Sequence, residues 1–239
     1  MTAQQPTIDP TTPAQQFYGR WARLYDLIAR RTPGIARIRR QAAVACGLDR
    51  GDTVVEMGCG TGANLHYLRE EVGPAGTVIG IDFTGPVLKR ARASTAVYDN
   101  VHVVRGDATA PPIAVPSSIE QSGDDGVDAI LATFVVGMLD DPADAVDRWC
   151  ALLSPEGHLV LVNAMRSDRR FAPVINAVFR AIVVASTPPT KQLRYESDPV
   201  ERLDARVTAA HDRLRLRSNA VLEATALFGI VRLLGGQIA

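Results

Sequence analysis

The chain has 239 residues, of which 46% are hydrophobic and 22% are charged, so it is long enough for one sizeable α/β domain and too short for two. Basic and acidic residues balance at 26 each, which excludes the overall positive field typical of nucleic-acid-binding proteins. No apolar run reaches the ~18 to 20 residues of a membrane span, and we expect no signal peptide. The three cysteines lie in apolar or glycine-rich settings, which favours a reduced, cytoplasmic protein.

The N-terminal part is predicted to be a flexible tail followed by two helices. Residues 1–14 have no apolar periodicity, which indicates the tail. Aromatic and aliphatic residues recur at helical spacing over residues 17–28, and a Pro-Gly pair at 33–34 separates this helix from a second one at 35–46. Residues 17–40 hold seven arginines and one acid. This stretch either attracts an anionic substrate or lipid surface or, in the interpretation we favour, is a solvated helix face.

A glycine-rich loop joins a predicted strand to a predicted helix within residues 54–65. The apolar, β-branched run stops at Glu56, and Gly58, Gly60 and Gly62 follow before the helical pattern starts. Residues without Cβ allow positive φ angles and let a ligand approach the backbone closely. The loop also matches the loose G-x-G-x-x-G/A pattern of dinucleotide-binding proteins. An acid two residues before the first glycine, however, disfavours a pyrophosphate and suits a cationic sulfonium or amino group.

Two further acids stand at the ends of the next two predicted strands. The apolar run at 77–81 ends at Asp82, about twenty residues past the loop, where a carboxylate can accept hydrogen bonds from ribose hydroxyls. The run at 101–104 leads to Asp107, which can receive an adenine amino group. Two strand-end acids beside one glycine loop predict an adenosine pocket.

The second half of the predicted core follows a long surface loop at 110–126. Residues 127–133 form a near-continuous apolar run, which is typical of a strand buried on both faces. Its end, at 134–139, is expected to open on the same side as the glycine loop, where ligands of doubly wound sheets bind. A helix at 142–153 then leads through a turn to a fifth strand at 158–164.

The remaining chain is predicted to be mainly helical. Residues 171–186 form a basic amphipathic helix, which can lie on a membrane, line a lipophilic acceptor pocket or, most commonly, pack as plain core. Residues 197–228 are predicted to form one long helix. Its expected inward residues are Leu203, Val207, His211, Leu214, Leu222 and Leu227.

Over residues 50–165 the sequence resembles the class I S-adenosylmethionine-dependent methyltransferases. Their first motif, acid-x-G-x-G-x-G, is matched here by Glu56, Gly58, Gly60 and Gly62. The resemblance implies an α/β fold with a Rossmann-like, doubly wound, mostly parallel sheet, N-terminal lid helices and a helical C-terminal insertion. It also implies S-adenosyl-L-methionine as the cofactor.

Both ends of the domain resemble a narrower group. Residues 18–26 resemble the Y-x-x-x-A-x-x-Y-D opening of the ubiquinone/menaquinone C-methyltransferases and bacterial phospholipid N-methyltransferases. In those enzymes this helix is part of a lid over cofactor and acceptor, which makes Tyr18 and Tyr25 lid candidates. Residues 228–239 resemble the last strands of the quinone enzymes but stop where the final antiparallel strand would start. We therefore expect that strand to be very short or absent.

The resemblance assigns a role to each acid and to the loop. The loop packs on the methionine part and the sugar, Asp82 holds the ribose hydroxyls and Asp107 meets the adenine. The residues expected to bind the cofactor are Glu56, Gly58, Cys59, Gly60, Gly62, Asn64, Asp82, Phe83, Asp107, Ala108, Phe134, Tyr18 and Tyr25. The expected organisation is a tail at 1–14 and a single domain at 15–239, with lid helices at 15–46, a cofactor-binding core at 50–165 and a helical cap at 166–228.

No catalytic residue is assigned from the sequence. In-line displacement at a sulfonium depends on alignment and desolvation, so a base is needed only where the acceptor loses a proton, and His211 is a candidate for it. No metal-ligand spacing occurs.

Three functions stay open. The first is methyl transfer to a small lipophilic acceptor, either a quinone precursor or an amine-headgroup lipid, with peripheral membrane contact. The second is methyl transfer to a polar metabolite or natural product. The third is a noncatalytic cofactor-binding or partner-activating role. None of them involves nucleic acid.

Overall fold

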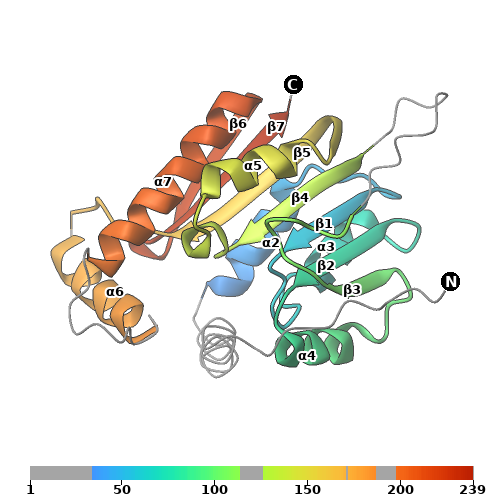
Figure 1. Ribbon diagram of the computed structural model, residues 1–239, viewed down its shortest axis with the longest axis horizontal. Coiled ribbons are helices and arrows are strands. Elements are labelled where there is room, and N and C mark those ends of the chain that lie inside the picture. The colour runs from blue at the N-terminus through green and yellow to red at the C-terminus, as the bar shows by residue number, and fades with distance from the viewer. Residues whose placement is uncertain (1–33, 114–125, 171, 187–197, 239) are drawn as a thin grey trace, which may run out of the picture.

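The computed structural model describes residues 34–113, 126–170, 172–186 and 198–238 (Figure 1). The strands are β1 (Thr53–Met57), β2 (Thr77–Asp82), β3 (Val101–Arg105), β4 (Val127–Thr133), β5 (Leu153–Ala164), β6 (Ser218–Ala226) and β7 (Val231–Ile238). The helices are α2 (Ile35–Ala45), α3 (Leu65–Val72), α4 (Gly85–Thr95), α5 (Pro142–Cys150), α6 (Ala172–Ser186) and α7 (Pro199–Arg217), with short 3₁₀ turns η1 (Val136–Met138) and η2 (Leu227–Gly229).

The strands form one seven-stranded sheet in the order β3-β2-β1-β4-β5-β7-β6. Strands β1 to β5 pair in parallel, whereas β7 is antiparallel to both of its neighbours. This arrangement confirms the predicted doubly wound, mostly parallel sheet. It also brings the carboxyl ends of β1, β2 and β4 to one edge, where ligands of such sheets bind.

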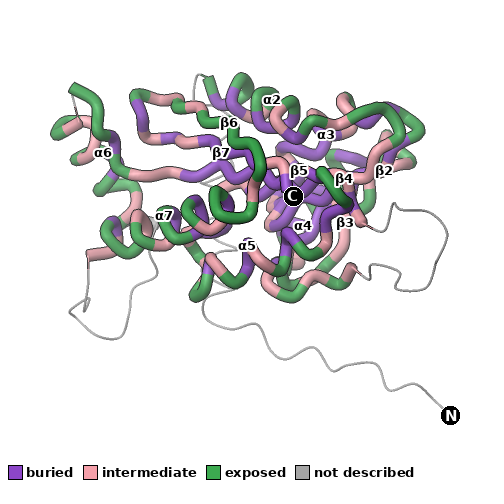
Figure 2. The backbone as a smooth tube through the Cα atoms, turned by 90° about the horizontal axis from the view of Figure 1, so that it is seen from above, coloured by how far each residue is buried: buried purple, intermediate pink, exposed green. Residues whose placement is uncertain are grey.

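Helices cover both faces of the sheet, with α2 and α3 on one side and α5 and α7 on the other (Figure 1). Strand β5 illustrates why the inner strands are apolar along their length. Leu159 and Leu161 pack in the core under α5 and α7, whereas Val160 and Val162 pack in the core under α2 and α3. Buried residues accordingly follow the strands and the inner helix faces, and the outer faces are exposed (Figure 2).

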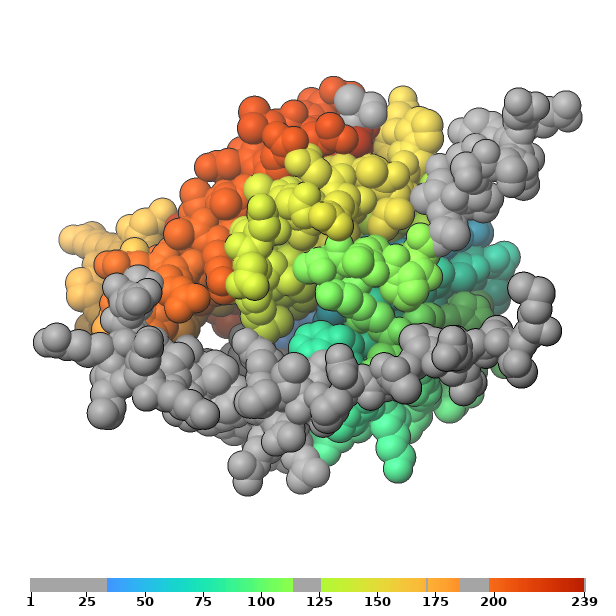
Figure 3. Space-filling model, in the orientation of Figure 1, coloured from blue at the N-terminus to red at the C-terminus, as the bar shows by residue number. Residues whose placement is uncertain are grey.

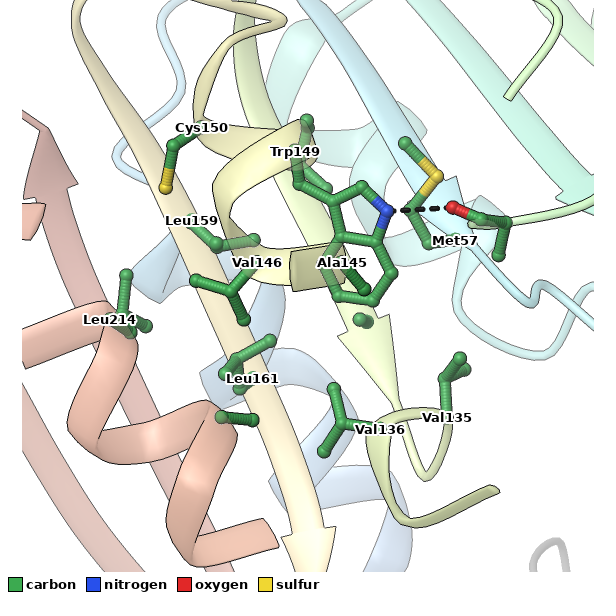
Figure 4. Packing of buried hydrophobic residues seen from close by; sticks show 14 of the residues in the cluster. Met57, Val135, Val136, Ala145, Val146, Trp149, Cys150, Leu159, Leu161 and Leu214 are labelled. Atoms are coloured by element: carbon green, nitrogen blue, oxygen red, sulfur yellow. Dashed lines mark hydrogen bonds between the residues drawn. The ribbon is translucent and has the colours of Figure 1, made fainter. Parts of the chain in front are cut away.

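Trp149 of α5 is fully buried among apolar side chains that include Met57 and Val146 (Figure 4). Its indole Nε1 donates a 2.7 Å hydrogen bond to the main-chain oxygen of Ala108, which satisfies the one polar atom of this side chain. The bond ties α5 to the segment after β3. On the surface of the molecule, α5 and α7 lie against one another (Figure 3).

The C-terminal part corrects the prediction of one helix at 197–228 and of a helical cap reaching residue 228. Helix α7 ends at Arg217, and β6 follows as the edge strand of the sheet. Leu222, which we expected to point inward, is 55% exposed on this strand. The last strand is neither short nor absent, since β7 runs for 8 residues between β5 and β6. Main-chain pairing with β7 stabilises the extended conformation of β6, and pairing of this kind overrides weak local propensity.

Helix α7 confirms the other part of that prediction. Val207, His211 and Leu214 are buried, and Leu203 packs against the same core. The helix starts with Pro199 in its first turn, after the Asp198 side chain, which accepts a hydrogen bond from a main-chain N–H of that turn.

Some predictions concern residues outside the described ranges. These are the tail, the first lid helix with Tyr18 and Tyr25, and most of the loop at 110–126. Of the two lid helices, the structure describes the second one, α2. Within the described ranges, no helix is long and apolar enough to cross a membrane.

Candidate functional site

The glycine loop between β1 and α3 uses its three glycines in two different ways. Gly58, Gly60 and Gly62 all have positive φ angles, of 70°, 54° and 78°. A Cβ on Gly58 would lie 2.4 Å from Val135 Cγ2, and one on Gly62 would lie 3.1 Å from the Cβ of Ala91, so these two glycines permit close packing of the loop. A Cβ on Gly60 would meet no atom of the described residues within 4 Å. Among these residues, Gly60 is therefore the glycine of the loop at which a ligand can approach the backbone most closely.

Asp82, at the end of β2, connects this loop to the next one. Its Oδ2 accepts a 3.0 Å hydrogen bond from the Gly60 main-chain N–H, and its Oδ1 accepts a 2.8 Å bond from Thr84 N–H. Burial raises the pKa of Asp82 above its ordinary value, and the two N–H groups oppose part of that rise. The Thr84 side chain also donates to this carboxylate, which has about four acceptor sites in all and can therefore still accept from a ligand hydroxyl.

Glu56, at 1% exposure, takes part in a hydrogen-bond network at the end of β1. Its Oε1 accepts from Asn64 Nδ2, which also donates to Thr133 Oγ1 at 3.0 Å, and Asn64 Oδ1 accepts from Arg39 Nη1 at 2.8 Å. The other oxygen, Oε2, has no hydrogen-bond partner among the described residues. Burial raises the pKa of Glu56 to about 8. A buried carboxyl oxygen without a partner, at the rim of a cavity, suits a cationic ligand group.

The segment after β2 and the segment after β3 form a mainly apolar wall of the cavity. Phe83, Val87 and Ala108 contribute apolar surface to the cavity, and Asp107 stands beside them. Asp107 Oδ1 accepts from both the main-chain N–H and the hydroxyl of Thr109, at 2.8 Å each. This wall has the composition that an adenine ring requires, an apolar slot with a hydrogen-bond acceptor at its edge.

Most of these groups line one cavity of about 450 Å³ at the carboxyl edge of the sheet. Of the predicted cofactor-binding residues, the cavity brings together Glu56, Gly58, Cys59, Gly60, Asn64, Asp82, Phe83, Asp107, Ala108 and Phe134. Gly62 does not line it, because this glycine faces α4 behind the loop. Cys59 is buried, and burial raises the pKa of its thiol, which does not favour a nucleophilic role.

Phe134, just past the end of β4, has a φ of 59°, in the left-handed region that bulky residues rarely adopt. Its main-chain N–H donates a 2.7 Å hydrogen bond to Val162 O, which helps to hold this conformation. The turn directs the following residues, Gly137 among them, along the cavity. Backbone outliers of this kind cluster at binding sites.

The far half of the cavity is lined partly by residues 134–139, which were expected to open on the ligand side, and by the helix at 171–186, for which an acceptor pocket was one of the alternatives. Its other lining residues were not assigned to a site from the sequence. It is mainly apolar, with side chains from the end of β4, from α6 and from α7. Those residues are Val135, Met138, Leu139, Phe179, Ile182, Val183, Pro199, Leu203 and Val207, together with Gly137, Asn163 and Ala164. Arg39 and Thr133 were missed on the cofactor side. Helical spacing had marked Leu203 and Val207 as inward, but no local signal separates a cavity wall from plain core.

His211, the candidate base, is 4% exposed and does not line the cavity. Its Nε2 lies 3.3 Å from Nδ2 of Asn163, which does line it. Burial, together with the positive charges of Arg215 and Arg232, lowers the pKa of His211 to about 4. The ring is therefore neutral at physiological pH and reaches the cavity only through Asn163, so a direct role as base is not supported.

Residues 55–159 match a protein family described as a methyltransferase domain. A 2-phytyl-1,4-naphtoquinone methyltransferase from Thermosynechococcus vestitus is 34% identical over 105 residues, 43% of this chain and 47% of that protein. A demethylmenaquinone methyltransferase from Staphylococcus aureus is 30% identical over 125 residues, 52% of this chain and 48% of that protein. The chain spans half or less of the length of the curated relatives it matches.

Solved structures agree with the fold over almost the whole chain. A SAM-dependent methyltransferase from Aquifex aeolicus superposes with a TM-score of 0.58 at 17% identity, covering 92% of this chain and 98% of that one. At this identity the likeness shows the fold alone, which is that of the class I methyltransferases.

The buried, neutral His211 predicts a specific pH dependence of stability. The unfolded chain binds a proton at this residue below about pH 6.5, whereas the folded chain does so only near pH 4. Protons bound only by the unfolded state lower the free energy of unfolding as the pH falls through this window, by up to about 3 kcal/mol. The free energy of unfolding, measured with urea, should fall less between pH 7 and pH 5 for His211→Gln than for the wild type. An equal fall in both proteins would contradict the lowered pKa of His211.

Proposed function

We propose that this chain is a class I S-adenosylmethionine-dependent methyltransferase, which transfers the methyl group of that cofactor to a small acceptor bound in the same cavity. This proposal rests on one observation, that the glycine loop and the apolar side chains of α6 and α7 line the same cavity. S-adenosylmethionine, when bound, supplies an electrophilic methyl group on a cationic sulfonium. The residues of the chain then align the two partners and exclude water, which is the main requirement of an in-line displacement.

The cofactor half offers a partner for each part of S-adenosylmethionine. Asp82, held by two main-chain N–H groups, would accept from the ribose hydroxyls. The wall with Phe83 and Ala108 would receive the adenine. The unpartnered Oε2 of Glu56 would bind the α-ammonium group, and Arg39, which lines the cavity beside Asn64, would bind the α-carboxylate. The residues present therefore fit this cofactor.

We further propose a small lipophilic acceptor, either a quinone precursor or an amine-headgroup lipid. The apolar walls from α6 and α7 support such a molecule over a polar metabolite, because a polar acceptor would leave its hydrogen bonds unpaired there. The names of the two quinone methyltransferases that resemble this chain point the same way. The noncatalytic alternative is less well supported, since Gly137 and the glycine loop line one continuous cavity.

Titration calorimetry with S-adenosylmethionine tests the function directly. The wild type should bind it with a Kd on the order of micromolar, and NAD should not bind. Asp82→Ala should weaken binding on the order of a hundredfold, because two hydrogen bonds to a charged group are lost. Asp99→Ala, which removes an exposed acid before β3, should change nothing. Binding of NAD, or equal affinity of the Asp82 and Asp99 variants for S-adenosylmethionine, would contradict the proposal.

The role given to Arg39 can be separated from a general effect on the site. S-adenosylhomocysteine and methylthioadenosine differ only in the amino-acid part that Arg39 would bind. Arg39→Ala should weaken the first ligand on the order of tenfold to a hundredfold and leave the second nearly unchanged. Arg37→Ala, on an exposed position of the same helix, serves as the control. Similar losses for both ligands would show that Arg39 only supports the loop.

Peripheral membrane contact stays a prediction. Helix α6 exposes Val174 and Val178, and Ile182, which also lines the cavity, continues this apolar stripe at the same spacing of four residues. If this stripe enters a lipid surface, the protein should float with phosphatidylglycerol vesicles, and Val178→Glu should reduce the floating fraction severalfold. Val97→Glu, which changes an exposed valine outside α6, is the matched control. Absence of the wild type from the vesicle fraction would contradict membrane contact.

A further inference from the structure

Asn163 is the one amide side chain among the described residues that line the apolar half of the cavity. It lies near the end of β5 and is 1% exposed, with Leu203 and Val207 of α7 lining the same half. Its Oδ1 has no hydrogen-bond partner among the described residues. A buried amide oxygen without a partner is destabilising, and the cost is recovered when a ligand donates a hydrogen bond to it.

The other end of the same amide is held from behind. Asn163 Nδ2 lies 3.3 Å from His211 Nε2, and because the amide nitrogen can only donate, the ring nitrogen must accept. A neutral imidazole supplies that lone pair, and burial of the ring, together with the nearby charges of Arg215 and Arg232, lowers the pKa of His211 and keeps it neutral. With Nδ2 directed at the ring, Oδ1 is the atom left for a ligand.

We propose that Asn163 binds the methyl acceptor through its amide oxygen, and that His211 is a positioning residue that keeps this oxygen available to the acceptor. The inference rests on the proposed methyltransferase function and narrows its acceptor. The matching chemistry is a neutral molecule with an apolar body and an O–H or N–H donor near the methylated atom. No basic side chain lines the apolar half within the described residues, so an anionic phosphate headgroup would have no counter-charge there.

The test uses two probes of nearly equal size, 1-naphthol, which has an O–H donor, and 1-methoxynaphthalene, which has none. Both are titrated into the protein saturated with S-adenosylhomocysteine. The wild type should bind the naphthol about five- to tenfold more tightly, as one net hydrogen bond predicts. Asn163→Leu, which keeps the side-chain size, should remove this preference while the methoxy compound binds as before or better. Asn163→Ser is the second variant, in case the leucine impairs folding.

The positioning role of His211 is tested by the same ratio of affinities. His211→Leu should reduce the preference for naphthol, whereas His211→Gln, which retains a hydrogen-bonding group behind the amide, should restore much of it. A purely structural role would lower the affinity for both probes equally and leave their ratio unchanged.

The outcomes separate this inference from the proposed function. If the wild type fails to bind S-adenosylhomocysteine, the proposed function falls. If it binds that ligand but shows the same probe ratio as Asn163→Leu, or binds neither probe, then the role of Asn163 is overturned and the proposed function stands.

Discussion

The buried hydrogen bond between Glu56 and Asn64 connects the elements that form the site. Asn64 stands at the N-terminus of α3, where an asparagine side chain commonly accepts a main-chain N–H, yet here it makes no such bond. Its amide instead donates to Glu56 of β1 and to Thr133 of β4, and it accepts from Arg39 of α2. The helix thus lacks a side-chain cap, which would stabilise it by about 1 kcal/mol. The same amide instead connects four elements, and these hydrogen bonds hold the glycine loop against the sheet.

The two halves of the cavity differ in polarity for a structural reason. The cofactor half is made by the ends of parallel strands and the loops that follow them, where main-chain N–H groups are free to orient carboxylates such as Asp82. The other half is walled largely by α6 and α7, whose main-chain groups are already bonded within each helix. Polar recognition along these two helices depends on side chains, which makes the buried amide of Asn163 an important polar feature of that half.

Local sequence patterns were sufficient to predict the sheet and most of the cofactor half of the cavity. Buried parallel strands are apolar along their length, so the runs that became β1, β2 and β4 were visible without any tertiary information. The positive φ angles of Gly58 and Gly60 and the acid that ends β2 follow from the chemistry of one short loop. Because each of these signals lies within a few residues, the sequence by itself determined the fold class and the cofactor that the site fits.

Only the tertiary structure decided the features that depend on residues far apart in the chain. Strand β6 is extended because β7 pairs with it, although its own sequence fits a helix. Arg39 reaches Asn64 across 25 residues, and His211 reaches Asn163 across 48. The packing of α7 on β5 places the candidate base, His211, behind the cavity wall. Such contacts produce no periodicity or fixed spacing in the sequence, because they depend on how helices and strands pack together and not on the residues of a single element.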